Sequence, residues 1–581
     1  MNLKSQQDKK LWQFWIDRGG TFTDVIGRKP DGEIVTHKLL SENSKHYPDA
    51  AIQGIRDLLG VSQQEAIPMS EIHTIKMGTT VATNALLERQ GENTVLAITK
   101  GFKDILRIGY QNRPRLFDLD IQLSEMLYSE VIEIDERLDS QGRCICVLDV
   151  GKTEIQLLKA FHSGYKSISI VLLHGYRFNE HEKQIEKLAK KIGFKQISVS
   201  HRVSPLMKII PRGDTTVMDA YLSPIIRHYV NQVEDALGKK AKEKGRLMFM
   251  QSSGGLTDAR FFQGKDAILS GPAGGVVGMV KTCEASSLNR LIGFDMGGTS
   301  TDVSHYAGDY ERASETEVAG VRCRAPMMLI HTVAAGGGSI LHFDGSRYRV
   351  GPNSAGAKPG PACYRNGGPL TITDCNVMLG KLNPDYFPKV FGPNADQPLD
   401  TEIVKDKFNA LAKNISQATG SQVNPIEVAE GFLSIAIDNM SNAIKKISVQ
   451  RGYDVSNYTI SCFGGAGAQH ACLVADNLGI ENIHLHPFAG VLSAFGIGLA
   501  DTRVINDLAI ESILRIDLIK NIETELESLK LKGTRQMSEQ GIEASSLKYF
   551  SRLQIRYDGS DSALSIRFNS IDRIILAFED A

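Results

Sequence analysis

Short apolar runs that end at acidic or small residues recur along the chain and predict buried β-strands. Residues 14–16 run into Asp17, residues 291–294 into Asp295, and residues 458–461 into a glycine cluster. Longer stretches with apolar residues three and four positions apart predict helices. Strands alternating with helices are typical of an α/β fold. Further elements are predicted as strands at 167–173, 196–200, 248–250, 553–557 and 563–568, and helices at 215–237 and 571–581.

An internal repeat organises this pattern. The nine residues from Asp17 to Val25, DRGGTFTDV, recur as DMGGTSTDV from Asp295 to Val303, 278 residues later, with seven identical positions. The spacing is far longer than a solenoid period. The sequence therefore predicts two related halves.

Each copy predicts a strand, a Gly-Gly-Thr turn and a returning strand, and backbone N–H groups around such a bend can hold phosphate. A carboxylate at the strand end suits a Mg²⁺ hydration shell or the orientation of a nucleophile. Asp17 and Asp295 are the candidates for that role, and each could instead only cap its turn. The other candidates are Gly19, Gly20, Thr21, Thr23, Gly297, Gly298, Thr299 and Thr301, with Asp24 and Asp302 as second carboxylates. A plain hairpin is the alternative for either copy, and duplication argues against it.

Two further glycine clusters follow apolar runs. Gly464, Gly465, Ala466 and Gly467 lie between a strand pattern and a helix pattern, as expected of a loop that borders a nucleotide. Gly336, Gly337 and Gly338 follow the apolar run 327–333 and are candidates for phosphate contact. Either cluster alone could be a packing device.

Composition narrows the possible partners and the compartment. The chain has 581 residues with 66 Lys+Arg and 67 Asp+Glu, a net charge of −1, which argues against nucleic acid or an anionic membrane as the main partner. No apolar run reaches the ~18 residues that a membrane span needs. The eight cysteines are scattered without a C-x-x-C pair, so we expect neither zinc nor a disulfide framework, and a cytoplasmic location.

Several longer motifs make the chain similar to a known family. These are FWIDRGGTFTDVIG (14–27), MGTTVATNALLER (77–89), TKGFKDILRIGYQNRPRLFDL (99–119), SGPAGGVVG (270–278), SAGAKPGPACY (354–364) and RGYDVSNYTISCFGGAGAQHA (451–471). Together they resemble the hydantoinase A and 5-oxoprolinase family, within the actin, Hsp70 and hexokinase-like ATPase superfamily. The resemblance implies two duplicated RNase-H-like halves around a nucleotide cleft, with the repeated turns as phosphate loops and 464–467 as the adenosine loop.

The resemblance also implies a reaction. ATP would phosphorylate the carbonyl oxygen of a cyclic amide such as 5-oxoproline, and water would open the activated ring. Asp17, Asp295 and Thr299 would be catalytic, with ATP and Mg²⁺ bound and a monovalent cation such as K⁺ as a further expectation. A hydantoinase-B-like half or subunit would be the partner, and we expect a homo-oligomer. Because such a half usually follows, we expect the chain, which ends at Ala581, to be a fragment.

Weaker candidates have structural alternatives. One set of polar residues could border substrate: Thr79, Thr80 and Asn84. The alternative is that this segment is a polar cap of a helix, with Thr83 or Asn84 as the cap residue. Arg113, beside Arg115, could bind a substrate carboxylate, although solvated arginines are the commoner case. Asp374 could line the cleft or be a helix N-cap, His470 could contact nucleotide or be a structural hydrogen-bonder, and Cys363 is expected to be a buried thiol.

The expected organisation is an N-terminal α/β half at 11–210, a second half at 211–505 and an α+β appendage at 506–581. Two rival functions remain. One is the ATP-using subunit of an N-methylhydantoinase or of a ketone carboxylase, which shares the core. The other is an ATP-driven conformational switch of the Hsp70 or actin kind, for which no peptide-binding or filament segment is recognisable.

Overall fold

The computed structural model describes residues 11–111, 117–121, 123, 125–313, 315–392, 396–560 and 562–581. Two sheets in it share one topology. The first contains β1 (Trp12–Arg18), β2 (Phe22–Arg28), β3 (Ile34–Leu40), β4 (Ile72–Thr79) and β11 (Leu247–Met250), with β12 (Leu256–Asp258) added at the β11 edge. β1, β2 and β3 are antiparallel neighbours, whereas β4 pairs in parallel with β1 and β11 in parallel with β4.

The second sheet repeats this arrangement strand for strand. β13 (Leu291–Met296), β14 (Thr301–Tyr306) and β19 (Ile330–Val333) are antiparallel, and β22 (Thr459–Phe463) and β23 (Asn482–His484) continue the sheet in parallel from β13. The nine-residue repeat therefore occupies the β1–β2 and β13–β14 turns. The expected pair of duplicated RNase-H-like halves is confirmed.

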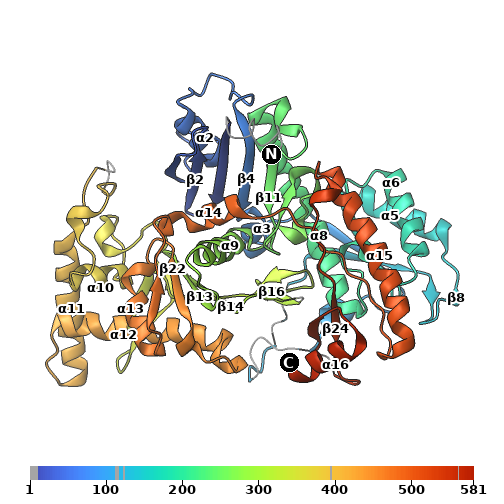
Figure 1. Cartoon of the computed structure of the whole chain (residues 1–581). Helices are drawn as coiled ribbons and strands as arrows, with labels where there is room; N and C mark the ends of the chain where they lie inside the picture. Colours follow the sequence, from blue (N-terminus) through green and yellow to red (C-terminus); the bar gives the residue numbers. More distant parts are fainter. Residues whose placement is uncertain are drawn as a thin grey trace.

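Two helices lie between the sheets, α9 (Ser270–Ala285) and α14 (Leu492–Leu499), as Figure 1 shows. They approach closely because glycines face each other: a Cβ at Gly496 would lie 2.0 Å from the carbonyl oxygen of Gly274 and 2.4 Å from the Gly278 nitrogen. Met250 from the first sheet and Phe463 from the second lie in one buried cluster with Val277 of α9. The two halves thus meet at a glycine-lined interface formed by α9 and α14, which we call the seam.

Other helices cover the outer faces. In the first half, α2 (Ala50–Leu59), α3 (Val81–Leu87) and α8 (Ile209–Leu237) bury Phe14 and Ile16. In the second half, α10 (Ile372–Met378), α11 (Thr401–Thr419), α12 (Pro425–Ile447) and α13 (Ala471–Leu478) cover Phe294, and the hairpin β20–β21 (Ser339–Phe343, Tyr348–Ser354) extends this half. The hairpin β16–β17 (Thr316–Val318, Val321–Cys323) packs instead against α8, with Val321 and Cys323 in the core of the first half. A four-stranded parallel sheet is inserted in the first half: β10 (Gln196–Val199), β9 (Ser167–Val171), β5 (Thr94–Thr99) and β6 (Tyr128–Ile134), with α5 (Val150–His162), α6 (Glu180–Ile192) and α7 (Ser200–Val203).

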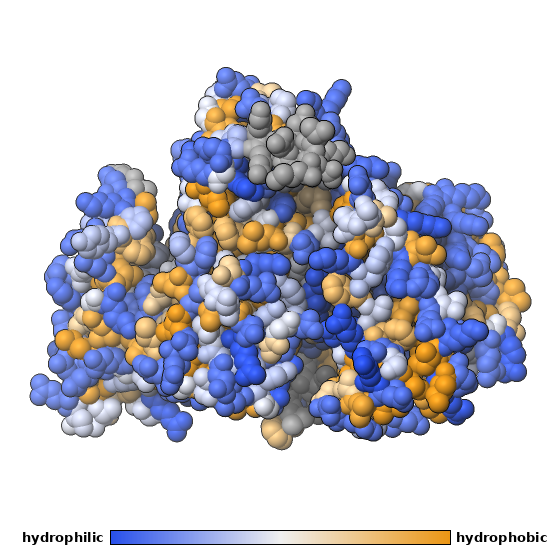
Figure 2. Space-filling model, viewed as in Figure 1, coloured by the Kyte–Doolittle hydropathy of each residue, from blue (hydrophilic) through white to orange (hydrophobic). Residues whose placement is uncertain are grey.

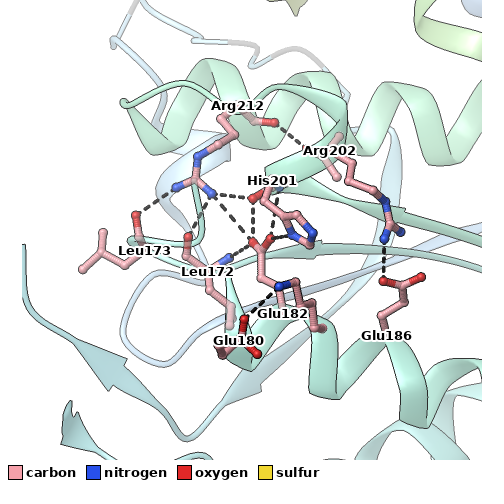
Figure 3. A network of polar contacts seen from close by, with 11 residues as sticks. Leu172, Leu173, Glu180, Glu182, Glu186, His201, Arg202 and Arg212 are labelled. Atoms are coloured by element: carbon pink, nitrogen blue, oxygen red, sulfur yellow. Dashed lines mark hydrogen bonds and ion pairs between the residues drawn. The ribbon is translucent and has the colours of Figure 1, made fainter. Parts of the chain in front are cut away.

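The expected boundary at residue 210 differs from the sheet connectivity. β11 and β12 follow residue 210, yet their hydrogen bonds to β4 make them part of the first sheet. Arg212, fully buried in α8, donates to the carbonyl oxygens of Leu172 and Leu173 at 2.9 Å each, and lies 3.8 Å from Glu182 (Figure 3). A buried charge is stable only when it is paired, so Arg212 depends on these partners. Since the partners precede residue 210 and Arg212 follows it, the network joins the two sides of that position.

The C-terminal segment forms the expected helix and strands. α15 (Ile516–Glu539) is followed by β24 (Arg552–Ile555), β25 (Leu564–Arg567) and α16 (Ile571–Asp580). Gln540 Oε1 accepts the Asp258 N–H at 2.9 Å, which fixes the end of α15 to the edge of the first sheet. Polar and apolar side chains are interspersed over the face in Figure 2. Within the described residues, no helix is long and apolar enough to cross a membrane.

Candidate active site

Strand alternation directs Asp17 and Asp295 towards α9. In β1, Phe14 and Ile16 pack on the outer core, so Trp15 and Asp17 face α14 and α9. A Cβ at Gly271 would lie 2.7 Å from Asp17 Oδ1, and a Cβ at Gly275, one turn further along α9, would lie 3.5 Å from Asp295 Oδ2. The two repeats therefore present their aspartates to neighbouring turns of one helix from opposite sides.

The two carboxyl groups are held in a place that disfavours their charged forms. Burial, with Asp24 as a second cause, raises the pKa of Asp17 to about 7. Burial also raises the pKa of Asp295 well above its ordinary value, and the carboxylates of Asp302, Asp17 and Asp24 add to that effect. Asp17 Oδ1 is buried and has no hydrogen-bond partner in the part of the chain that the structure describes. Clustered carboxylates with raised pKa values mark this seam as a candidate functional site.

The repeated turns leave donors free at matching positions. Gly19 donates its N–H to Phe22 O at 3.1 Å, and Gly297 donates to Ser300 O at 3.0 Å, which closes both turns. For the next two residues, Gly20 and Thr21 or Gly298 and Thr299, no acceptor of the N–H group occurs among the described residues. Gly20, Gly298 and Thr299 are exposed and Thr21 is half-buried. Both turns thus offer adjacent amides to an anion.

The later threonines of the motif support the turns instead. Thr23 and Thr301 are both fully buried. The Thr23 hydroxyl lies 3.0 Å from that of Ser41, which in turn donates to Gly19 O, and Thr301 donates to Ala335 O at 2.5 Å. These hydroxyl groups have protein partners, whereas those of Thr21 and Thr299 have none among the described residues.

The glycines at 336–338 also brace a turn. We expected their amides to face phosphate, but Gly336 N–H donates to Ser339 Oγ, Gly337 N–H to Gly297 O and Gly338 N–H to Gly298 O, at 2.9, 3.1 and 2.6 Å. A Cβ at Gly336 would lie 2.6 Å from the Ser300 nitrogen. The segment packs against the second turn, and the N–H groups of Gly337 and Gly338 donate to carbonyl oxygens of that turn.

The 464–467 loop lies beside Asp295. Gly464 has φ +82°, and a Cβ there would lie 2.4 Å from Asp295 Oδ1, so glycine is required on both counts. Ala466 donates its N–H to Met296 O at 2.9 Å, and Gly467 is buried against Cys462. Gly465 is exposed, with open space where a Cβ would be. The loop is positioned to border a ligand that reaches the second turn.

The structure assigns supporting contacts to Thr79 and Thr80. Thr79 is fully buried, and its N–H donates to Ser270 Oγ while its own Oγ1 accepts the Val81 N–H. Thr80 precedes α3 and donates to Arg18 O at 3.2 Å, so the helix begins before Thr83 and Asn84, which we had considered as its cap. The Asn84 side chain is half-buried with no partner among the described residues.

Three weaker candidates are structural in their contacts. Asp374 accepts N–H groups of Ala362, Cys363 and Thr371; the N-cap of α10 is Thr371, and Asp374 is the third helical residue of its capping box, so it supports the cap without being the N-cap itself. Cys363 is buried, and burial raises the pKa of its thiol. His470 is fully buried with Asn376 Nδ2 3.2 Å from its Nε2. Arg113 and Arg115 lie outside the described residues.

Sequence reasoning missed the groups that packing brings to the aspartates. Lys38 on β3 lies 2.5 Å from Asp24 Oδ1, and Ser270 at the start of α9 bonds to both the N–H and the carbonyl of Thr79. The signal for Lys38 was its place in the second strand after the first turn, β3, which only the strand register makes informative. Among the described residues, no group of three or more His, Cys, Asp or Glu side chains could hold a metal ion.

Taken together, the duplicated sheets and the paired turns define a two-lobed α/β protein of the actin and Hsp70 type. Family models place it more narrowly: residues 212–506 match the hydantoinase/oxoprolinase model and residues 13–193 match the hydantoinase/oxoprolinase N-terminal region. The chain belongs to the hydantoinase/oxoprolinase family.

Individual relatives agree with this assignment. The chain is 42% identical to 5-oxoprolinase 1 of Arabidopsis thaliana over 96% of its length and 46% of that protein, and 42% identical to 5-oxoprolinase of Saccharomyces cerevisiae over 95% and 46%. It thus spans about half the length of these curated relatives. The crystal structure of the ATP-dependent caprolactamase from Pseudomonas jessenii matches with TM-score 0.83 and 26% identity, over 98% of this chain and 84% of that one. An acetone carboxylase structure, at 23% identity and TM-score 0.72, shares the fold.

Proposed function

We propose that this chain is the ATP-using part of a 5-oxoprolinase, which converts 5-oxo-L-proline, ATP and water to L-glutamate, ADP and phosphate. The observation that carries the proposal is the pair of turns with free amides, each next to a half-buried aspartate whose pKa is raised, at one seam between the lobes. The relatives named 5-oxoprolinase support the choice of substrate.

The chemistry of the substrate explains why such a site suits the reaction. A lactam is stabilised by resonance, and its nitrogen is a poor leaving group. Phosphorylation of the carbonyl oxygen makes the ring carbon electrophilic and converts that oxygen into a phosphate leaving group. The protein then has mainly to position the reactants and stabilise charge, which backbone amides and enclosed carboxylates do.

The residues present fit a Mg²⁺ ion. Asp17 Oδ1 is buried without a partner among the described residues, and a cation would stabilise the charged carboxylates that burial, and then the neighbouring carboxylates, disfavour at Asp17 and Asp295. Two carboxylates suffice because Mg²⁺ retains several waters and binds phosphate oxygens. When bound, the ion would neutralise charge on the phosphates, and Asp17 and Asp295 would hold it. A K⁺ site, a hydantoinase-B-like partner and a homo-oligomer remain part of the proposal from family resemblance.

Other cyclic amides are the second candidate. The caprolactamase whose structure matches acts on a larger lactam, as its name states, and this chain covers 84% of it. The turns and aspartates would serve any lactam, so the side chains around the ring decide between substrates. If no lactam binds, hydantoins and ketones become the next candidate substrates.

Calorimetric titration tests the proposal. A Mg²⁺-bound, non-hydrolysable ATP analogue is titrated into the chain, followed by 5-oxo-L-proline into the loaded protein, with ε-caprolactam and hydantoin as comparisons. We expect the analogue to bind and to strengthen 5-oxoproline binding. Absence of nucleotide binding would overturn the central claim, and preference for another ring would change the substrate.

A further inference from the structure

Lys38 shares one face of the first sheet with two of the aspartates. The register of β1 and β2 places Asp17 opposite Asp24, and that of β2 and β3 places Asp24 opposite Lys38. Residues directly opposite in neighbouring strands point to the same side. All three side chains therefore face α9 and α14, where the lobes meet.

The Lys38 ammonium group acts on carboxylates of both lobes. It is ion-paired with Asp24, and its charge lowers the pKa of Asp17, Asp24 and Asp295 against the larger effect of burial. Among the residues that the structure describes, Lys38 is the cation that affects these three pKa values. A single positive charge thus lies among the carboxylates of the two motifs.

The second half of the molecule lacks this cation. There Asp295 is opposite Asp302, and Asp302 is opposite Thr332, whose hydroxyl donates to Asp302 Oδ1 at 2.6 Å. Lys38 and Thr332 occupy the same register position in the two sheets. The duplicated halves therefore differ in charge at this point, although their turns and aspartates are the same.

The Lys38 side chain is partly exposed. Its exposed fraction is 47%, and its Nζ is ion-paired with Asp24 Oδ1 at 2.5 Å. The Phe22 ring lies 5.5 Å from Nζ, and Lys38 borders an open hollow with Thr36 and Phe488. Because the Lys38 side chain of this pair is in contact with water, solvent screens the attraction to Asp24, so one anion can be exchanged for another.

We propose that Lys38 is the phosphate-binding cation of this site, and that its Nζ exchanges Asp24 for a non-bridging oxygen of a polyphosphate held between the two turns. The proposal rests on the proposed function for the identity of the ligand. The chemical class it requires is a di- or triphosphate, because the two turns lie on opposite lobes. In the absence of ligand, the ion pair with Asp24 keeps the Lys38 ammonium group at the site.

The test uses matched variants in the β2–β3 hairpin. Lys38→Met removes the charge, Lys38→Arg keeps it, and Lys29→Met removes another ion pair of the same hairpin, Lys29 with Glu33. Inorganic pyrophosphate without added metal, the ATP analogue and adenosine are titrated into each by calorimetry, with circular dichroism as the check of folding.

We expect Lys38→Met to weaken binding of pyrophosphate and of the analogue by about 10-fold or more, as loss of a charge-assisted hydrogen bond does, while adenosine binding stays the same. Lys38→Arg and Lys29→Met should stay within about 3-fold of the unmodified chain. Equal affinities in Lys38→Met and the unmodified chain, or an equal loss for adenosine, would overturn the proposal.

The outcomes separate this proposal from the proposed function. If pyrophosphate binding depends on Lys38 but no nucleotide binds, the role of Lys38 stands and the proposed function fails. If nucleotide binds independently of Lys38, only the present inference fails, and if the unmodified chain binds neither ligand, both fail. Asp24→Asn adds a further check: it should strengthen pyrophosphate binding more in the unmodified chain than in the Lys38→Met variant, and equal gains would contradict the exchange.

Discussion

At the scale of single residues, the site depends on side chains that have no good partner. Glycines of α9 and of the 464–467 loop enclose Asp17 and Asp295. Burial in that setting raises the pKa of both carboxyl groups and so favours their uncharged forms. The sequence predicted both residues, since each ends an apolar strand in the repeat. It could not predict Lys38, because its relation to Asp24 exists only across a strand pair.

Removing either carboxylate should change how nucleotide binding depends on the metal ion. For Asp17→Asn and Asp295→Asn we expect tighter binding of the ATP analogue without Mg²⁺, because repulsion is removed, and loss of the gain that Mg²⁺ gives to the unmodified chain. Calorimetry with and without Mg²⁺ measures both effects. An unchanged response to Mg²⁺ in both variants would show that neither residue handles the ion.

His470 should make the protein sensitive to acid. Burial, with Lys381 as a lesser cause, lowers its pKa to about 4 from an ordinary 6.5. Between these values the unfolded chain binds more protons, so the free energy of unfolding falls as the pH drops from 6.5 to 4. That contribution is fully present above pH 6.5, and the loss reaches about 3 kcal/mol at the acid end.

Urea denaturation at pH 7 and pH 4.5 measures the effect of His470. We expect His470→Gln to lose much less stability between the two pH values than the unmodified chain. His46→Gln, at an exposed histidine, is the control and should follow the unmodified chain. Parallel pH dependence of all three proteins would show that His470 is not the responsible group.

At the scale of elements, helix packing sets the distance between the two turns. α9 carries Gly271 against Asp17 and Gly275 against Asp295, and its Gly274 and Gly278 accept the close approach of α14. Sequence patterns predicted most strands and helices within a few residues, including β9, β10, β24 and α16. The start of α8 was missed, because Ile209–Gly213 is fixed by packing and by the Arg212 network rather than by periodicity.

A methyl group between α9 and α14 should destabilise the seam. In Gly496→Ala the new Cβ would meet backbone atoms of Gly274 and Gly278, which cannot rotate away, so we expect a loss of about 3 kcal/mol in the free energy of unfolding and weaker nucleotide binding. Gly490→Ala, where a Cβ meets open space, is the control and should lie within about 1 kcal/mol of the unmodified chain. Equal stabilities in denaturant would contradict the packing seen here.

At the scale of the whole molecule, contacts distant in sequence complete each half. β11 joins the first sheet about 170 residues after β4, the inserted sheet is tied back by Arg212, and Gln540 fastens α15 to β12. The expected division at residue 210 separates β11 from the sheet that it joins, because periodicity marks where strands are but not which strands pair. Family resemblance located the duplicated cores correctly, since the turn motifs lie within them.

Loss of the Gln540 contact should affect stability without affecting the site. Gln540→Leu leaves the buried Asp258 N–H without its acceptor, and we expect a loss of about 1–3 kcal/mol in the free energy of unfolding with unchanged nucleotide affinity. Ser538→Ala, on the exposed side of the same helix, serves as the control. A matching loss of nucleotide affinity in Gln540→Leu would mean that the C-terminal segment also shapes the site.

The sequence by itself determined the duplicated halves, the two turns and their aspartates, because those features are local: an apolar strand, a glycine turn and a carboxylate are contiguous in the chain. Tertiary structure alone decided which glycines are free to donate and which brace a turn, since Gly20 and Gly298 are distinguished from Gly336–Gly338 only by what packs against them. It also decided that Lys38 has no counterpart in the second half. Burial and strand register are properties of the assembled sheets, and no local pattern encodes them.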